Sequence, residues 1–197
     1  MHFPHTMNEQ INFTNKKIPE SITAETLKAL SYYPALKDTP IAFKFKKNIK
    51  KSTMQAQPIF GSFFRSRKNR EYVILISKRV KIDKEVFKIT DVPSDVLIGW
   101  IGHELGHVMD YRERGTIDMF FFGIKYLYST GHIQEAERAA DTFAVAHGMG
   151  DYILKTKDFI LNHADISEAY KNRIRQLYLS PEEIMQLIEE HSDEEKV

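Results

Sequence analysis

Three glycines interrupt an otherwise apolar helical pattern in residues 98–115, which read IGWIGHELGHVMDYRERG. Gly99, Gly102 and Gly106 each cost a helix about 0.5–1 kcal/mol relative to alanine. Apolar residues still recur with a helical period on another face of the segment. The glycines form a strip without side chains, which allows a second backbone to approach closely. The segment therefore predicts a helix that packs tightly against a neighbour on its glycine side.

The same helix carries the pattern H-E-x-x-H as His103, Glu104 and His107. Successive residues of an α-helix are rotated by about 100°, so two side chains four residues apart share a face. Two imidazoles in this arrangement can bind one metal ion, with zinc–nitrogen bonds of about 2.0–2.1 Å. Glu104 points a quarter turn aside, where it can contact a water on that metal without being a ligand. This pattern on a helix is typical of zinc-dependent hydrolases.

A second helix, predicted over residues 131–148, offers a matching strip of small residues: Ala136, Ala140 and Ala144. Glu137 and Asp141 lie beside that strip, one helical turn apart. If the glycine strip packs on the alanine strip, the carboxylate of Glu137 reaches the two imidazoles. We therefore expect Glu137 to be the third metal ligand. Glu135 is its nearest rival, although it lacks an aspartate four residues further on.

Other metal-binding and nucleophilic schemes find less support in the sequence. The metzincin pattern requires a glycine and then a histidine at positions that hold Asp110 and Glu113 here, so it fails. The segment GTIDMFFFG partly matches the motif of zinc proteases with an aspartate ligand, which leaves Asp118 as an alternative, but the tyrosine of that motif is missing. The chain has no cysteine, which excludes thiolate ligands, disulfides and cysteine nucleophiles.

The motif HELGH followed by ERAAD resembles the gluzincin metallopeptidases over roughly residues 71–148, and most of all their small, soluble minigluzincin-like members. The resemblance implies a zincin-like fold with Glu104 as the general base. Its zinc ligands would be His103, His107 and Glu137. It also implies that Asp141 accepts a hydrogen bond from the non-metal nitrogen of a ligand histidine, expected to be His103. The strand at 71–77 (EYVILIS) would border the substrate cleft.

The resemblance further implies a zinc-dependent hydrolase that cleaves peptide bonds through a metal-activated water, with one zinc ion per chain. Its partner would be a peptide or protein substrate, and an open strand at the cleft favours endopeptidase action. The alternative is a latent or regulatory gluzincin-like metal-binding protein, similar to the ImmA/IrrE type, with little or no turnover. The donor that stabilises the transition state stays open among five residues: His132, His147, His163, Tyr111 and Tyr152.

The rest of the chain predicts an α+β fold. Residues 21–34 indicate a short helix, and a small, mostly antiparallel sheet follows from three β-rich runs at 41–47, 53–60 and 71–77. After the active-site helix the pattern is mainly helical, at 131–148, 151–163, 166–179 and 180–191. We expect one metallopeptidase domain over 1–197. It would comprise an N-terminal α/β subdomain (about 20–115), which includes the active-site helix, and a helical C-terminal subdomain (about 116–190).

The formal net charge of +1 gives no reason to expect nucleic acid as a partner. Residues 119–128 are strongly apolar, but a membrane-spanning helix needs about 18 such residues; we interpret them as core, with pocket lining or membrane contact as alternatives. The N-terminus lacks the pattern of a secretory signal, so a cytoplasmic protein is expected, and a homodimer is left open. Two basic clusters are interpreted as solvated turns, with an acidic partner as the alternative: Lys46, Lys47, Lys50, Lys51, Arg65, Arg67, Lys68 and Arg70.

Overall fold

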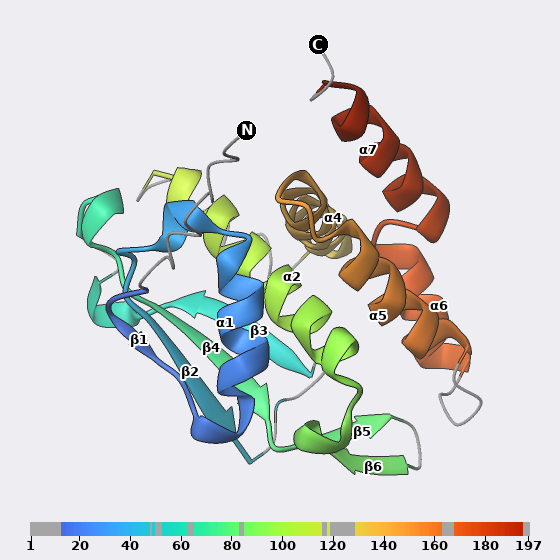
Figure 1. The fold of residues 1–197 in the computed structure, drawn as a ribbon, viewed down its shortest axis with the longest axis horizontal. Coiled ribbons are helices and arrows are strands. Elements are labelled where there is room, and N and C mark those ends of the chain that lie inside the picture. The colour runs from blue at the N-terminus through green and yellow to red at the C-terminus, as the bar shows by residue number, and fades with distance from the viewer. Residues whose placement is uncertain are drawn as a thin grey trace, which may run out of the picture.

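The computed structural model describes residues 13–47, 49, 53–62, 65–82, 85–115, 118, 129–162 and 168–194. The apolar run 119–128, together with His163, Lys50 and Lys51, lies outside the described residues. The described elements form an α+β fold, in which a small sheet lies on one side and a group of helices on the other (Figure 1).

The sheet has four strands in the spatial order β1-β2-β4-β3, namely β1 (Lys16–Lys17), β2 (Ile41–Lys46), β3 (Met54–Pro58) and β4 (Tyr72–Ser77). Strands β1, β2 and β4 are parallel, whereas β3 pairs antiparallel with β4. The expectation of a mostly antiparallel sheet is therefore wrong. Most of the sheet is parallel for two reasons. Strand β4 lies between β2 and β3, and helix α1 (Thr23–Ser31) connects β1 to β2 as a crossover.

The helices follow the sequence pattern closely. Beyond α1, the described helices are α2 (Ser94–Glu113), α4 (Thr130–Ala146), α5 (Gly150–Asn162), α6 (Glu168–Leu177) and α7 (Pro181–Glu194). A capping box begins the last helix, because the Ser180 N–H donates to Glu183 Oε2 (2.8 Å) and the Glu183 N–H donates to Ser180 Oγ (3.2 Å). None of the helices that the structure describes is long and apolar enough to cross a membrane.

Shorter elements complete the described chain. A two-stranded hairpin, β5 (Arg79–Ile82) and β6 (Glu85–Lys88), precedes α2 and was not expected from the sequence. The 3-10 turns are Glu20–Ile22, Pro34–Leu36, Phe60–Ser62, Arg67–Asn69 and Ile89–Asp91.

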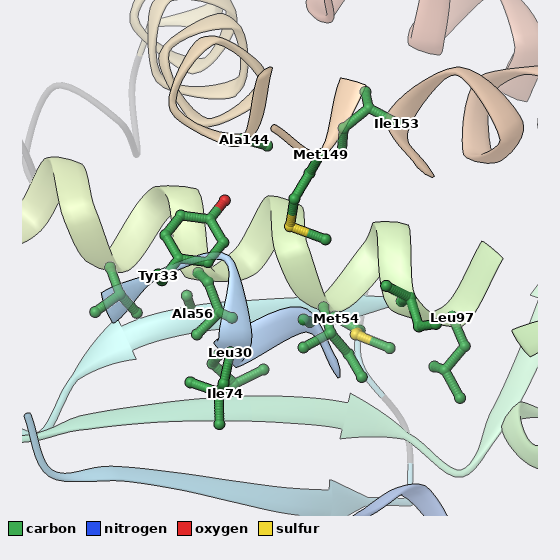
Figure 2. Close-up of a cluster of buried hydrophobic side chains, with 14 of the residues drawn as sticks. Leu30, Tyr33, Met54, Ala56, Ile74, Leu97, Ala144, Met149 and Ile153 are labelled. Carbon is green, nitrogen blue, oxygen red and sulfur yellow. The ribbon is translucent and has the colours of Figure 1, made fainter. Parts of the chain in front are cut away.

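Helix α2 is the central element of the fold (Figure 1). Most of its residues are buried, because the sheet and α1 cover one side and α4 and α5 cover the other. Figure 2 shows Leu30 and Ile74 on the sheet side of this helix, and Ala144 and Met149 on the opposite side. A helix that is enclosed in this way can present polar side chains in a dry environment, which is the setting of the histidines.

The glycine strip of α2 makes the predicted close contact, but with two helices rather than one. A Cβ added at Gly106 would overlap the backbone of Ala140 in α4, so the predicted contact of glycine with alanine is present here. A Cβ at Gly99 would instead overlap the backbone of α5, and one at Gly102 would overlap the side chain of Met149. The alanine strip therefore covers one glycine of the three, and α5 covers another.

Replacing Gly106 by alanine is expected to lower the free energy of unfolding by about 1–3 kcal/mol. The added Cβ would overlap the backbone oxygen of Ala140, which outweighs the gain of about 1 kcal/mol in helix propensity. Urea unfolding followed by circular dichroism measures the change. Gly61→Ala is the control, because a Cβ there meets no atom within 4 Å. Equal stability of Gly106→Ala and the wild type would contradict the close contact.

One residue of the basic clusters is not solvated. Arg70 is 1% exposed, and its Nη1 donates to the backbone carbonyls of Tyr111 (3.1 Å) and Arg114 (2.8 Å). These carbonyls lie at the C-terminal end of α2, where a positive charge is favourable. The interpretation as a solvated turn is therefore wrong for Arg70, whereas Arg65 and Arg67 are exposed.

Candidate metal centre

Helices α2 and α4 bring together the three residues that were predicted as metal ligands. The Nε2 atom of His103 lies 3.0 Å from Oε2 of Glu137, and Nε2 of His107 lies 3.4 Å from the same oxygen. One potential ligand atom from each of the three residues lies within 4.8 Å of the others, and all three residues are buried. They form a buried group that could hold a metal ion.

The separations fit a single small ion. Ligand atoms about 2.0–2.1 Å from a tetrahedral zinc ion are about 3.3 Å apart. The two distances from Glu137 to the imidazoles, 3.0 and 3.4 Å, lie on either side of that value. Two imidazoles and a carboxylate are also a donor set that zinc binds in catalytic sites, where a fourth position stays open.

The electrostatics of the pocket favour a positive charge. Burial lowers the pKa of His103, but its hydrogen bonds with Asp141 and Glu137 outweigh this effect and raise the pKa to about 10. Burial raises the pKa of Glu137, yet His107 and His103 hold it well below its usual range. In the absence of a metal, a proton on an imidazole balances the carboxylate. A bound cation would take over that role.

Asp141 orients one of the imidazoles. Its Oδ1 lies 2.8 Å from Nδ1 of His103, and because the ionised carboxylate can only accept, Nδ1 carries the proton. Without a metal the protonated ring also donates through Nε2 to Oε2 of Glu137 (3.0 Å), and loss of that proton would leave the Nε2 lone pair available to a metal ion. The other oxygen of Asp141 accepts from Nζ of Lys157 (2.8 Å) and from the N–H of Leu179 (3.1 Å). The structure thus places Asp141 where the resemblance implied, held by donors from three directions.

Replacing Asp141 by asparagine is expected to lower metal affinity about 10- to 100-fold. An asparagine oxygen can still accept from Nδ1 of His103, but its amide group then faces the donors of Lys157 and Leu179. Competition with a metal chelator of known affinity measures the loss. Thr142→Ala, one residue further along α4 on an exposed position, is the control. Unchanged metal affinity in Asp141→Asn would show that this carboxylate does not fix the tautomer and orientation of the His103 imidazole.

Glu104 is buried beside the ligands but does not belong to the ligand group. Its Oε2 accepts a hydrogen bond from the backbone N–H of Ala56 in β3 (2.6 Å). Burial raises the pKa of Glu104, and the opposing effects of His107, His103 and the Ala56 N–H do not cancel this rise. A carboxylate with a raised pKa can take and release a proton closer to neutral pH than an exposed one.

The strand beside the site is β3, and the expectation that residues 71–77 border the cleft is wrong. Strand β4 is paired on both sides, whereas β3 is an edge strand. The backbones of Thr53 and Ile59 form hydrogen bonds toward β4. Because the direction of backbone hydrogen bonds alternates along a strand, Ala56 points its N–H outward from the edge of the sheet, where it donates to Glu104. The sequence order of the strands does not reveal this, because the last strand before α2 inserts into the middle of the sheet.

A cavity of about 60 Å³ adjoins the site. Its walls include His103 and Glu104 of α2 and side chains from α5, α6 and the segment after α6. Tyr178 lies in that segment, with its ring centroid 5.5 Å from the ring of His103 and 4.1 Å from Nζ of Lys157. Burial raises the pKa of Tyr178 well above its usual range, which keeps the hydroxyl protonated and able to donate. Sequence reasoning missed both Tyr178 and Lys157, since neither belongs to a motif.

Of the residues predicted as transition-state donors, the four that the structure describes do not line this cavity, and His163 lies outside the described residues. Tyr111 stacks on His107, Tyr152 packs against Tyr32, and His147 stacks on Tyr33. His132 lies 3.1 Å from Glu135 and has no part in the described ligand group.

The two alternative ligands are also elsewhere. The carboxylate of Asp118 is exposed and lies 3.9 Å from the guanidinium of Arg114, and Glu135 is exposed beside His132. Neither joins the group formed by the three predicted ligands, as far as the described residues extend.

Comparisons with protein-family models, with curated proteins and with solved structures found no match for this chain.

Proposed function

We propose that this protein is a zinc-dependent metallopeptidase of the gluzincin type, which hydrolyses peptide bonds with Glu104 as the general base. One observation carries the proposal: His103, His107 and Glu137 meet at separations suited to one zinc ion, with Glu104 beside them and outside the ligand group. A purely structural metal site would not require a buried, hydrogen-bonded carboxylate at that position.

The contacts support a role for each of these residues. His103 and His107 would bind zinc through Nε2, and Glu137 through its carboxylate, while Asp141 holds His103 in the required tautomer. When bound, zinc acts as a Lewis acid, which lowers the pKa of a water to about 7 and polarises a substrate carbonyl.

The protein's own side chains would then move the protons. Glu104 is anchored through Oε2 by the Ala56 N–H, and its other oxygen is left to take a proton from the attacking water. The same carboxyl group would deliver this proton to the leaving amine, which restores the base. The hydroxyl of Tyr178 would donate a hydrogen bond to the oxygen on which negative charge develops. Tyr178 suits this role because it lines the cavity beside His103 and Glu104.

One observation favours a second function, a regulatory metal-binding protein with little turnover. The hydrogen bond between Glu104 and Ala56 occupies one oxygen of the proposed base and ties it to the edge strand. A chain that binds metal stoichiometrically and cleaves nothing would fit this alternative.

Digestion of a broad peptide library by the zinc-loaded protein, read by mass spectrometry, distinguishes the two functions. We expect cleavage that stops when a chelator removes the metal and returns after one equivalent of zinc is added. The products also define the sequence preference around the cleaved bond. Full metal occupancy without any cleavage would favour the regulatory alternative over the proposal.

A further inference from the structure

One cation in the cavity wall, Arg173, has no ion-pair partner among the residues that the structure describes. On α6, Tyr170, Arg173 and Ile174 share the face that lines the cavity beside Glu104. Arg173 is partly buried, yet its guanidinium forms no hydrogen bond and no ion pair with any described residue. Unpaired arginines are costly to hold near apolar surface, and a guanidinium offers a planar fork of donors that matches a carboxylate.

The other cations nearby are already paired. Lys157, which lines the same cavity, donates to Asp141 (2.8 Å) and lies over the ring of Tyr178. Arg175, two residues beyond Arg173 on the same helix, is exposed and lies 3.3 Å from Glu168. Arg173 is therefore the cavity cation that is free to bind a ligand, among the residues that the structure describes.

The remaining walls restrict what can enter. Their apolar part comes from Trp100, Ile153, Ile160 and Ile174, and the carboxylates of Glu104 and Asp141 also line the cavity. A cavity of about 60 Å³ has room for a short or branched chain of a few heavy atoms, and not for a large aromatic ring. A group with an aliphatic stem and a charged end fits both the walls and the guanidinium.

We propose that this cavity is a carboxylate-recognition subsite, and that Arg173 selects substrates with a carboxylate on the residue that follows the cleaved bond. The proposal rests on the proposed peptidase function, because Glu104 lines the cavity and would pass its proton to the amine of that residue. The carboxylate has two possible sources, an acidic side chain or the C-terminus of the peptide. Arg173 is thus a specificity-determining residue, which the metal site does not require.

Binding can be measured without turnover, because the chain has a single tryptophan and Trp100 lines the cavity. Two pairs of probes, titrated against the zinc-loaded protein and followed by tryptophan fluorescence, separate the sources of the carboxylate. N-acetyl-glutamate α-amide and N-acetyl-glutamine α-amide differ in a side-chain carboxylate, and N-acetyl-leucine and its amide differ in a C-terminal one.

We expect one acidic probe to bind about 10- to 100-fold more tightly than the corresponding uncharged amide. This preference should disappear in Arg173→Gln and persist in Arg175→Gln, with part of it retained in Arg173→Lys. The metal content of each variant shows that its site is intact.

The proposal is overturned if neither acidic probe binds more tightly than its amide. It is also overturned if the preference for the acidic probe survives in Arg173→Gln, because the carboxylate would then bind to the metal or to another residue. The assay is separate from the proposed hydrolysis. If the preference is found and no peptide is cleaved, the subsite stands and the peptidase function fails.

Discussion

Replacement of Glu137 by alanine is expected to lower zinc affinity by more than about a hundredfold. This loss is larger than that expected for a residue such as Asp141, which only hydrogen-bonds to a ligand. The change removes the one carboxylate that both imidazoles face, at 3.0 and 3.4 Å. Two histidines on a single helix would remain, and these bind zinc weakly compared with three protein ligands. Chelator competition on purified protein measures the affinity.

A matched control for this variant lies two residues earlier on α4. Glu135 is exposed beside His132 and lies outside the ligand group. Glu135→Ala should therefore bind zinc as the wild type does. If Glu137→Ala and Glu135→Ala have the same affinity, Glu137 is not a ligand and the site has been misassigned.

Glu104→Gln is expected to separate metal binding from turnover. The amide keeps the size of the side chain, and its oxygen can still accept the hydrogen bond from Ala56, but it cannot take a proton from water. Loss of a general base costs a reaction about 10²- to 10⁴-fold in rate. Zinc content measured by atomic absorption should stay near that of the wild type, while cleavage of the best library peptide falls by this factor.

The informative result is the contrast between the two variants. Glu137→Ala should lose metal and activity together, whereas Glu104→Gln should lose activity alone. Hydrolysis by Glu104→Gln at the wild-type rate would refute the assignment of the base, and loss of zinc from this variant would make Glu104 a ligand.

Much of the candidate metal centre is predictable because it depends on local spacing. Side chains four residues apart on a helix share a face, so the sequence alone predicts that His103 and His107 lie together. The contact between Gly106 and Ala140 explains why Glu137 approaches them, since small residues allow the two helices to lie close. Helix boundaries were also well predicted, because the capping residues and glycines that end helices act locally, as at Ser180 and Gly148.

The features that sequence reasoning missed depend on segments that meet only after folding. Strand β4 inserts between β2 and β3, and no local pattern records that choice, so the cleft strand was misassigned. Arg70 resembles its exposed basic neighbours in sequence, yet it lies buried at the end of α2. Tyr178 and Arg173 line the site because α6 packs against α4 and the segment after α6 brings Tyr178 beside His103. Their roles follow from position in space, which residue type and spacing do not specify.

The most direct test is an anomalous diffraction experiment at the zinc absorption edge on crystals grown with zinc. The account predicts one strong peak per chain, within bonding distance of Nε2 of His103, Nε2 of His107 and the carboxylate of Glu137. A peak that is bound by other residues, with the Glu137 side chain turned to solvent, would contradict it.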